Sequence, residues 1–132
     1  MATQVRISFI ITGVGVNPVD ITSYIGVKPT ETWHAGDRIQ ESELKCKYDG
    51  WCLSSDREDS LYLDEQVQSI LNKIQPHTTK IKQLCNKLNL KIEVACAVYI
   101  ENNEIPSIHF DEEIVKIIAD LRAEIDIDLY IQ

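Results

Sequence analysis

Hydrophobic and polar residues alternate along three stretches of the chain, at residues 4–12, 92–100 and 125–131. A period of two places every second side chain on the same face, which is typical of a β-strand with one buried and one exposed face. Shorter segments within residues 30–39 and at residues 51–54 predict two further strands. The alternation therefore predicts a protein that contains a sheet of several strands.

Hydrophobic residues recur at helical spacing along residues 63–88 and 114–121. Pro76 interrupts the first of these segments, because proline removes a backbone hydrogen bond from a helix interior. The segment is therefore expected to form either two helices or one kinked helical unit. Near the N-terminus, Asn17-Pro18 predicts the start of a short helix, with asparagine as its N-cap, and Gly26 predicts its end.

The remaining segments connect these elements. Asp49-Gly50 predicts a turn, residues 54–60 a charged loop, and Ile105 to Phe110 an edge strand or extended connection. The order is β-α-β-β-α-α-β, followed by the extended piece, a helix and a strand, and its first part matches the split β-α-β pattern of ferredoxin-like folds. We expect one α+β domain over residues 1–132. Its sheet should be mostly antiparallel with helices packed on one face, and a C-terminal helix and strand should extend the ferredoxin-like core.

Composition limits the classes of function. Of 132 residues, 44% are hydrophobic and 26% charged, and 13 Lys and Arg against 21 Asp and Glu leave a net charge of -8. No hydrophobic stretch approaches the roughly 20 residues of a membrane span. The excess of acidic over basic residues argues against a nucleic-acid binder, because nonspecific affinity for nucleic acid comes from basic side chains that contact phosphates. The first residues enter a strand pattern without the features of a signal peptide. We therefore expect a cytoplasmic protein that binds neither membrane nor nucleic acid.

The negative charge is concentrated at the C-terminal end. Residues 101–132 contain nine acidic and two basic residues, so they carry -7 of the net -8, whereas residues 66–92 contain lysines and no acidic residue. Two solvated surfaces, which keep a protein soluble, explain such a distribution. It is also typical of an acidic face that attracts a basic protein partner.

Two acidic residues of the last predicted strand, Asp126 and Asp128, project from the same face; Glu124 shares it, and Asp120 lies a little upstream. Paired carboxylates can bind a divalent cation or act in acid–base chemistry, but a complete metal site needs further oxygen ligands, which the sequence does not place. A solvated strand face and a contact surface for a partner are the other interpretations. We expect no metal and assign these four residues to partner binding.

The segment from Trp33 to Asp37 gathers side chains that can stack, titrate and hydrogen-bond. An active site here would need a nucleophile or a second base beside His34, and neither stands at a recognisable spacing. Trp33 and Trp51 lie in neighbouring predicted strands, where they could pack across a hairpin or form exposed aromatic anchors for a partner. We expect no catalytic residue and assign Trp33, His34, Asp37 and Trp51 to partner binding.

Four cysteines, at positions 46, 52, 85 and 96, form no Cys-x-x-Cys pair and have no histidine at zinc-ligand spacing. Without a secretory signal we expect reduced thiols, and Cys85 and Cys96 fall on hydrophobic faces as small core residues. The sequence thus predicts no metal site and no cofactor.

The segment from Tyr24 to Asp37 (YIGVKPTETWHAGD) resembles the signature of a bacterial domain-of-unknown-function family, number 4279. Three other segments are similar to that family: Gly50 to Ser54, Ile105 to Ile108 before a helix, and the closing Glu124 to Tyr130. Cys52 after the tryptophan and Ala35 before the glycine depart from its pattern. The resemblance spans nearly the whole chain and implies a small, single-domain bacterial cytoplasmic protein of α+β type, with no catalytic residues to carry over.

These observations lead to two competing hypotheses about function. The first is a noncatalytic protein-binding module of a bacterial cytoplasm, an immunity protein that neutralises a basic toxin through an acidic face. The alternative is a small-ligand-binding domain or small enzyme that uses the Trp33–Asp37 segment. The chain is expected to be a monomer, or a homodimer formed through an exposed edge of its sheet.

Overall fold

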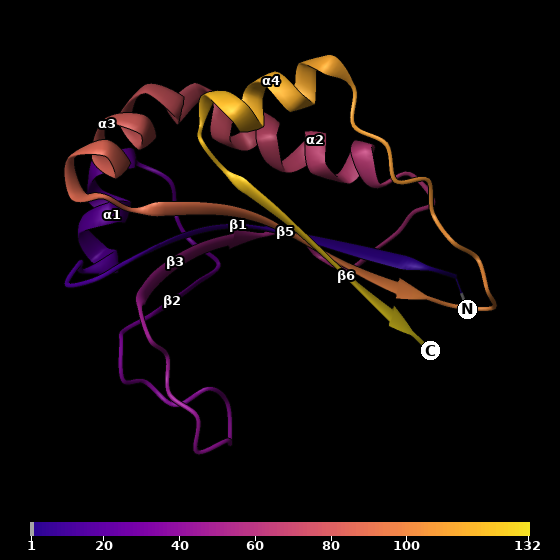
Figure 1. Cartoon of the computed structure of the whole chain (residues 1–132), viewed down its shortest axis with the longest axis horizontal. Coiled ribbons are helices and arrows are strands. Elements are labelled where there is room, and N and C mark those ends of the chain that lie inside the picture. Colours follow the sequence, from indigo (N-terminus) through magenta and orange to yellow (C-terminus); the bar gives the residue numbers. More distant parts are fainter. Residues whose placement is uncertain (1) are drawn as a thin grey trace.

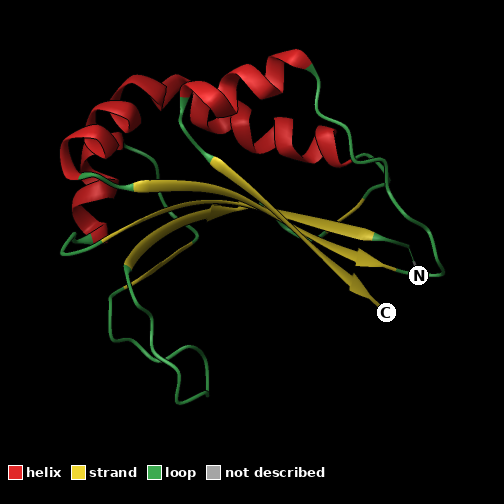
Figure 2. Cartoon of the chain, in the orientation of Figure 1, coloured by secondary structure: helices red, strands yellow, loops and turns green. Residues whose placement is uncertain are grey.

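The computed structural model describes residues 2–132, which form a single β-sheet with a layer of helices on one of its faces (Figure 1, Figure 2). The strands are β1 (Gln4–Gly13), β2 (Glu31–Trp33), β3 (Asp49–Ser54), β4 (Glu58–Asp59), β5 (Lys91–Ile100) and β6 (Glu124–Ile131). The helices are α1 (Pro18–Ile25), α2 (Leu63–Ile74), α3 (Thr78–Leu88) and α4 (Glu112–Asp120), with the 3₁₀ turn η1 (Gln75–His77) between α2 and α3. Of the helices in the described residues, none combines the length and the apolar character that a membrane crossing requires.

The strand order of the sheet is β2-β3-β1-β5-β6, and the short β4 pairs with the first residues of β1. β3 and β5 both run antiparallel to β1, one on each side of it, and α2 and α3 connect them, so these elements form a split β-α-β unit. β6 pairs in parallel with β5, and α4 provides the crossover between the two strands. The predicted α+β class is confirmed, with its mostly antiparallel sheet and its helices on one face.

The hydrophobic core lies between the sheet and the helices. In β1 every second residue from Val5 to Ile11 is fully buried, and in β5 every second residue from Ile92 to Ile100 is at most 5% exposed. Helix α2 turns five hydrophobic side chains towards this space: Leu63, Val67, Ile70, Leu71 and Ile74. Burying each side chain of this size stabilises the fold by roughly 1.5–3 kcal/mol. The alternating and the helical patterns thus describe two sides of one core.

The helix boundaries follow local signals in the sequence. The side chain of Asn17 accepts a hydrogen bond from the backbone N–H of Val19 at 3.1 Å, and Gly26 ends α1 in the left-handed conformation with φ of 77°. At the start of α4, Asp111 accepts a hydrogen bond from the N–H of Ile114 at 2.9 Å. The predicted start and end of α1 are confirmed.

Asp49-Gly50 does not form the predicted turn. Both residues lie inside β3, where they pair with Gly13 and Thr12 of β1. Glycine is required at this position because a Cβ on Gly50 would collide with the ring of Trp33. The dipeptide therefore serves a close packing contact within the sheet rather than a chain reversal.

Two connections contain structure that the sequence does not indicate. Residues 54–60, expected to be a loop, include the short strand β4, which pairs with the start of β1. Residues 34–48, between β2 and β3, project from the helix-free side of the sheet, and we call them the arm (Figure 1). The N–H of Gly36 donates to the carbonyl of Cys46 at 2.8 Å, and the N–H of Cys46 donates to the carbonyl of Asp37 at 2.8 Å. These bonds tie the two sides of the arm together near its base.

Candidate functional site

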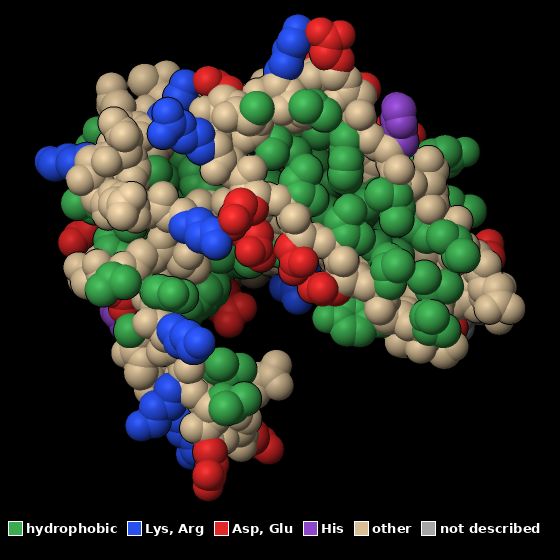
Figure 3. All heavy atoms as spheres, in the orientation of Figure 1, with side chains coloured by type: hydrophobic (Ala, Val, Ile, Leu, Met, Phe, Trp, Pro, Cys, Tyr) green, Lys and Arg blue, Asp and Glu red, His purple; other side chains and the backbone are tan. Residues whose placement is uncertain are grey.

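The helix-free face of the sheet carries acidic side chains on its last two strands. Glu93 of β5 and Glu124 of β6 are partners in the parallel register, and Asp126 and Asp128 follow on the same face of β6. Figure 3 shows acidic side chains following the course of β6, with hydrophobic side chains on the other side of the strand. We call these four residues the acidic row: Glu93, Glu124, Asp126 and Asp128.

The carboxylates of the acidic row repel one another. Repulsion from Asp128 is the largest effect that raises the pKa of Asp126. Burial raises the pKa of Glu93, and the negative charges of Asp126 and Glu124 add to this effect. The Nζ of Lys91 lies 2.7 Å from a carboxylate oxygen of Glu124, and this hydrogen-bonded contact raises the pKa of Lys91. Lys91 neutralises one charge of the row, which keeps a net negative charge.

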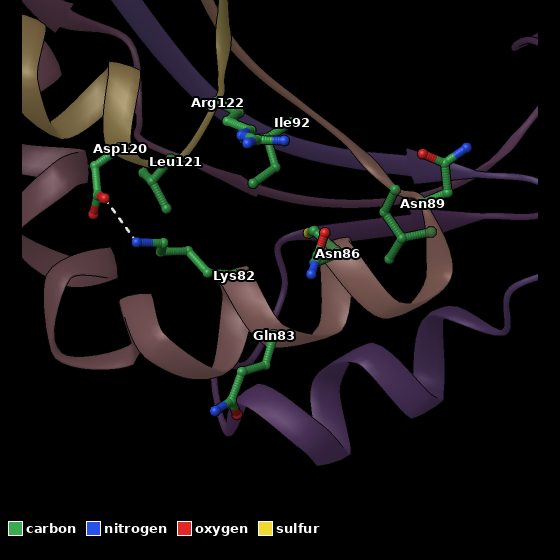
Figure 4. A pocket seen from close by; sticks show the side chains of 10 residues that line it. Lys82, Gln83, Asn86, Asn89, Ile92, Asp120, Leu121 and Arg122 are labelled. Atoms are coloured by element: carbon green, nitrogen blue, oxygen red, sulfur yellow. Dashed lines mark hydrogen bonds and ion pairs between the residues drawn. The ribbon is translucent and has the colours of Figure 1, made fainter.

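Asp120 does not join the acidic row. It ends α4, where its Oδ1 lies 2.7 Å from the Nζ of Lys82 on α3 (Figure 4). The pair lies at a hollow of about 480 Å³ between α3 and the turn from α4 to β6, which Arg122 also lines. The lysine-rich and acid-rich segments, separate along the sequence, therefore meet in space and partly neutralise each other.

The two tryptophans lie on opposite faces of the sheet. Trp33 pairs with Gly50, faces the helix-free side and is partly exposed. Trp51 is fully buried beneath the helices, and its indole N–H donates a hydrogen bond to Oγ1 of Thr22 in α1 at 3.0 Å. The two rings therefore do not pack together across a hairpin. Trp51 is a core residue rather than the exposed anchor expected from the sequence, because its position in β3 turns it towards α1.

His34 and Asp37 form a tight turn at the base of the arm. The backbone N–H of His34 donates to Oδ2 of Asp37 at 2.7 Å, and the N–H of Asp37 donates to the carbonyl of His34 at 3.0 Å. The imidazole of His34 is 59% exposed, with its Nδ1 3.9 Å from Oδ1 of Asp49. The carboxylate of Asp37 thus accepts a backbone hydrogen bond, which gives it a structural role in this turn.

Asp49 is a buried carboxylate that the sequence pattern does not single out. It is 7% exposed and accepts hydrogen bonds from the backbone N–H of Ala35 at 2.8 Å and of Val16 at 2.9 Å. The bond from Ala35 is the strongest influence on the pKa of Asp49 and lowers it; the bond from Val16 and the nearby His34 act in the same direction, and burial opposes them. Asp49 therefore connects β3, the base of the arm and the loop before α1.

A shallow hollow of about 500 Å³ lies on the helix-free face where β1 and β3 meet the arm. Its lining combines aromatic, basic and thiol side chains, among them Arg6, Trp33, Lys47, Tyr48 and Cys52. Of the predicted segment, Trp33 contributes to this hollow, and His34 and Asp37 do not. If the protein binds a small ligand through the Trp33–Asp37 segment, this hollow beside Trp33 is the candidate binding site.

The four cysteines are free thiols in the structure, and Cys52 and Cys96 are buried. Among residues 2–132, no group of three or more histidine, cysteine and acidic side chains is placed to hold a metal ion. Cys96 packs in the core, as its position on the hydrophobic face of β5 predicts. Cys85 is partly buried and packs against the hydrophobic core.

The chain belongs to the family described as Domain of unknown function (DUF4279), whose model matches residues 3–132. This match confirms the resemblance carried by the four sequence segments from Tyr24 to Tyr130. No protein with a curated description and no solved structure matches the chain.

Proposed function

We propose that the protein is a noncatalytic protein-binding module that receives a basic partner on the acidic row, as an immunity protein of a bacterial cytoplasm that neutralises a basic toxin would. One observation carries this proposal: four carboxylates share one face of two neighbouring strands at an edge of the sheet. The ion pair from Lys91 to Glu124 offsets one of these charges.

The electrostatics of the acidic row favour a cationic partner. The negative charge of Asp126 lies beside that of Asp128. The repulsion between the two carboxylates raises the pKa of Asp126. A lysine or arginine of a partner placed between them would remove this repulsion and add an attraction. Complementary charge also speeds the encounter of two proteins, because it steers them towards each other before contact.

The proposal is tested by coexpression with the protein encoded by the neighbouring gene, which the immunity hypothesis expects to be basic and toxic. We expect this chain to rescue growth and to bind the purified neighbour. The variant Asp126→Asn with Asp128→Asn should reduce the association rate by about tenfold at low salt, and the difference should shrink as salt is added. Since the substitution relieves repulsion, it should not lower thermal stability.

A matched control removes the same charge from the helix side of the molecule. Glu112 and Glu113 lie exposed in the first turn of α4, so Glu112→Gln with Glu113→Gln changes the net charge equally away from the acidic row. We expect this control to bind nearly as the parent does. Equal losses in the two variants would show that net charge alone governs binding, and no binding at micromolar concentration would count against the proposal as a whole.

A second candidate function, the binding of a small ligand, has support from the hollow beside Trp33. A ligand in that hollow should change the fluorescence of Trp33, whereas Trp51 lies on the opposite face and should respond little. A panel of small metabolites can be screened in this way against the parent and against Trp33→Phe. A signal that persists in Trp33→Phe would place the ligand elsewhere.

A further inference from the structure

β6 is an edge strand with both of its faces largely exposed. Seven of its eight residues are exposed and one is intermediate, whereas its neighbour β5 buries every second residue. Ile125, Leu129 and Ile131 lie on the helix side of the sheet, yet they are 40%, 51% and 80% exposed. Together with Ile127 we call these residues the apolar row. Hydrophobic side chains continue from β6 towards α4 on this side (Figure 3).

We infer that the outer edge of β6 binds an extended segment of the basic partner by strand addition. The segment alternates basic residues, which lie over the acidic row, with hydrophobic residues, which lie over the apolar row. The inference rests on the proposed function and adds the chemistry and conformation of the partner's contact segment.

The backbone of β6 is arranged for such an addition. The N–H of Gln132 donates to the carbonyl of Ile100 in β5 at 3.0 Å, and the register between the two strands is uninterrupted from Glu124 to Ile131. In a parallel ladder, alternate residues of a strand direct their N–H and C=O groups to the same neighbour. Gln132 and the even-numbered residues of β6 therefore bond to β5, and the residues of the apolar row direct theirs to the open edge. Within residues 2–132, no strand pairs with that edge.

The two faces of β6 select the partner. Cross-strand neighbours on the helix-free face would lie beside the acidic row, where a lysine or arginine is favoured and an acidic residue is opposed. On the helix side, a hydrophobic side chain would cover the apolar row, whose members are incompletely covered by this chain. A segment that alternates basic and hydrophobic residues would pair with the acidic row on one face and cover the apolar row on the other. Its backbone would form hydrogen bonds with the open edge of β6.

A second copy of this chain fits the edge poorly. If two β6 strands paired antiparallel with Ile127 opposite its own copy, Asp126 of one would face Asp128 of the other. The other registers that keep the hydrophobic residues on one face also bring acidic residues of the two copies close together. This repulsion favours a basic partner over self-association.

The experiment uses the intact protein and a peptide of 8 residues, the length of β6, in which lysine alternates with valine. A shuffled peptide of identical composition is the control for charge. We expect the alternating peptide to bind at least about tenfold more tightly than the shuffled one, as measured by isothermal titration calorimetry. Hydrogen exchange followed by NMR should show new protection at the outward amides of the apolar row.

Backbone methylation of the peptide tests strand addition without changing the protein. In one peptide the backbone nitrogens of the valine residues are methylated. In a second peptide the backbone nitrogens of the lysine residues are methylated, and their side-chain amines are unchanged. An added strand directs only one of these two sets towards β6, so one methylated peptide should lose binding and the other should retain it. Loss with methylated valines indicates antiparallel addition, and loss with methylated lysines indicates parallel addition.

Four results would overturn the inference. Equal binding of the alternating and shuffled peptides, or of the two methylated peptides, would leave charge attraction as the mode of binding; the proposed function would then stand without strand addition. Failure of all the peptides to bind would also reject strand addition, while the neighbour-protein assay decides the proposed function independently. A dimer in light scattering, with the amides of the apolar row protected before peptide is added, would identify a second copy as the occupant.

Discussion

Replacing Thr22 with valine removes the hydroxyl that accepts the hydrogen bond of the buried Trp51 indole. The Nε1–Oγ1 distance is 3.0 Å and Trp51 is fully buried, so the N–H has a partner only as long as the hydroxyl is present. Valine has nearly the shape of threonine, and therefore the packing between α1 and β3 should change little. The substitution isolates the hydrogen bond.

The expected cost follows from leaving a buried donor unpaired, which is about 1–3 kcal/mol. The hydroxyl of Thr22 also donates to the carbonyl of Pro18, but at 3.4 Å this bond is long and contributes little. For a chain of 132 residues, an unfolding entropy of about 2.1 cal/mol/K per residue converts this cost into a lowering of Tm by about 4–11 °C.

The assay is thermal and urea unfolding followed by circular dichroism, with Thr22→Ser as the control that keeps the hydroxyl. We expect Thr22→Ser to lie close to the parent and Thr22→Val to be destabilised. In the background of Trp51→Phe, which has no N–H, the same Thr22→Val change should cost less by about 1–3 kcal/mol, because no buried donor is left unpaired. If Thr22→Val proves as stable as Thr22→Ser, the hydroxyl does not hold the indole, and the reasoning is refuted.

Two further predictions concern titratable groups. Because the pKa of Asp49 is lowered in the folded protein, its ionised form stabilises the fold above the unfolded-state pKa, and this stability is lost as pH falls through the folded-state pKa. The parent should therefore lose its advantage over Asp49→Asn in urea unfolding below about pH 4; an advantage that persists in acid would contradict this. Burial raises the pKa of Cys85 to about 11 and that of Cys96 to about 12, so both thiols should react slowly with Ellman's reagent at pH 8 until urea unfolds the chain. Native-state labelling of Cys96 at the rate of a free peptide thiol would disprove its burial.

The sequence by itself determined most of the helices and strands, and which face of each is hydrophobic. The alternation in residues 4–12 and 92–100 predicts β1 and β5, because a period of two is a property of the strand alone. The helical stripes and the end signals of α1, Asn17-Pro18 and Gly26, act within a few residues of the chain. Such local signals are readable without knowing what packs against them.

Only the tertiary structure decided which side chains became neighbours. Asp49-Gly50 carries the same local signal in a turn and in a strand, and its role depends on the distant partners Ala35 and Val16. Glu93 lies close to Asp126 because β6 pairs in parallel with β5. The register of this pairing cannot be predicted from the sequence of either strand alone. Trp51 is covered by α1 for the same reason: its surroundings come from another part of the chain.

The clearest contrast is between β5 and β6, which show the same alternation in the sequence. β5 is buried on its hydrophobic face because it lies inside the sheet under the helices, and β6 stays exposed because it lies at the edge. Periodicity determines which face of a strand is hydrophobic, but coverage depends on what the rest of the chain places over that face. The apolar row, on the face of β6 opposite to its acidic residues, was therefore visible in the sequence as a pattern, and only the fold made it an open surface.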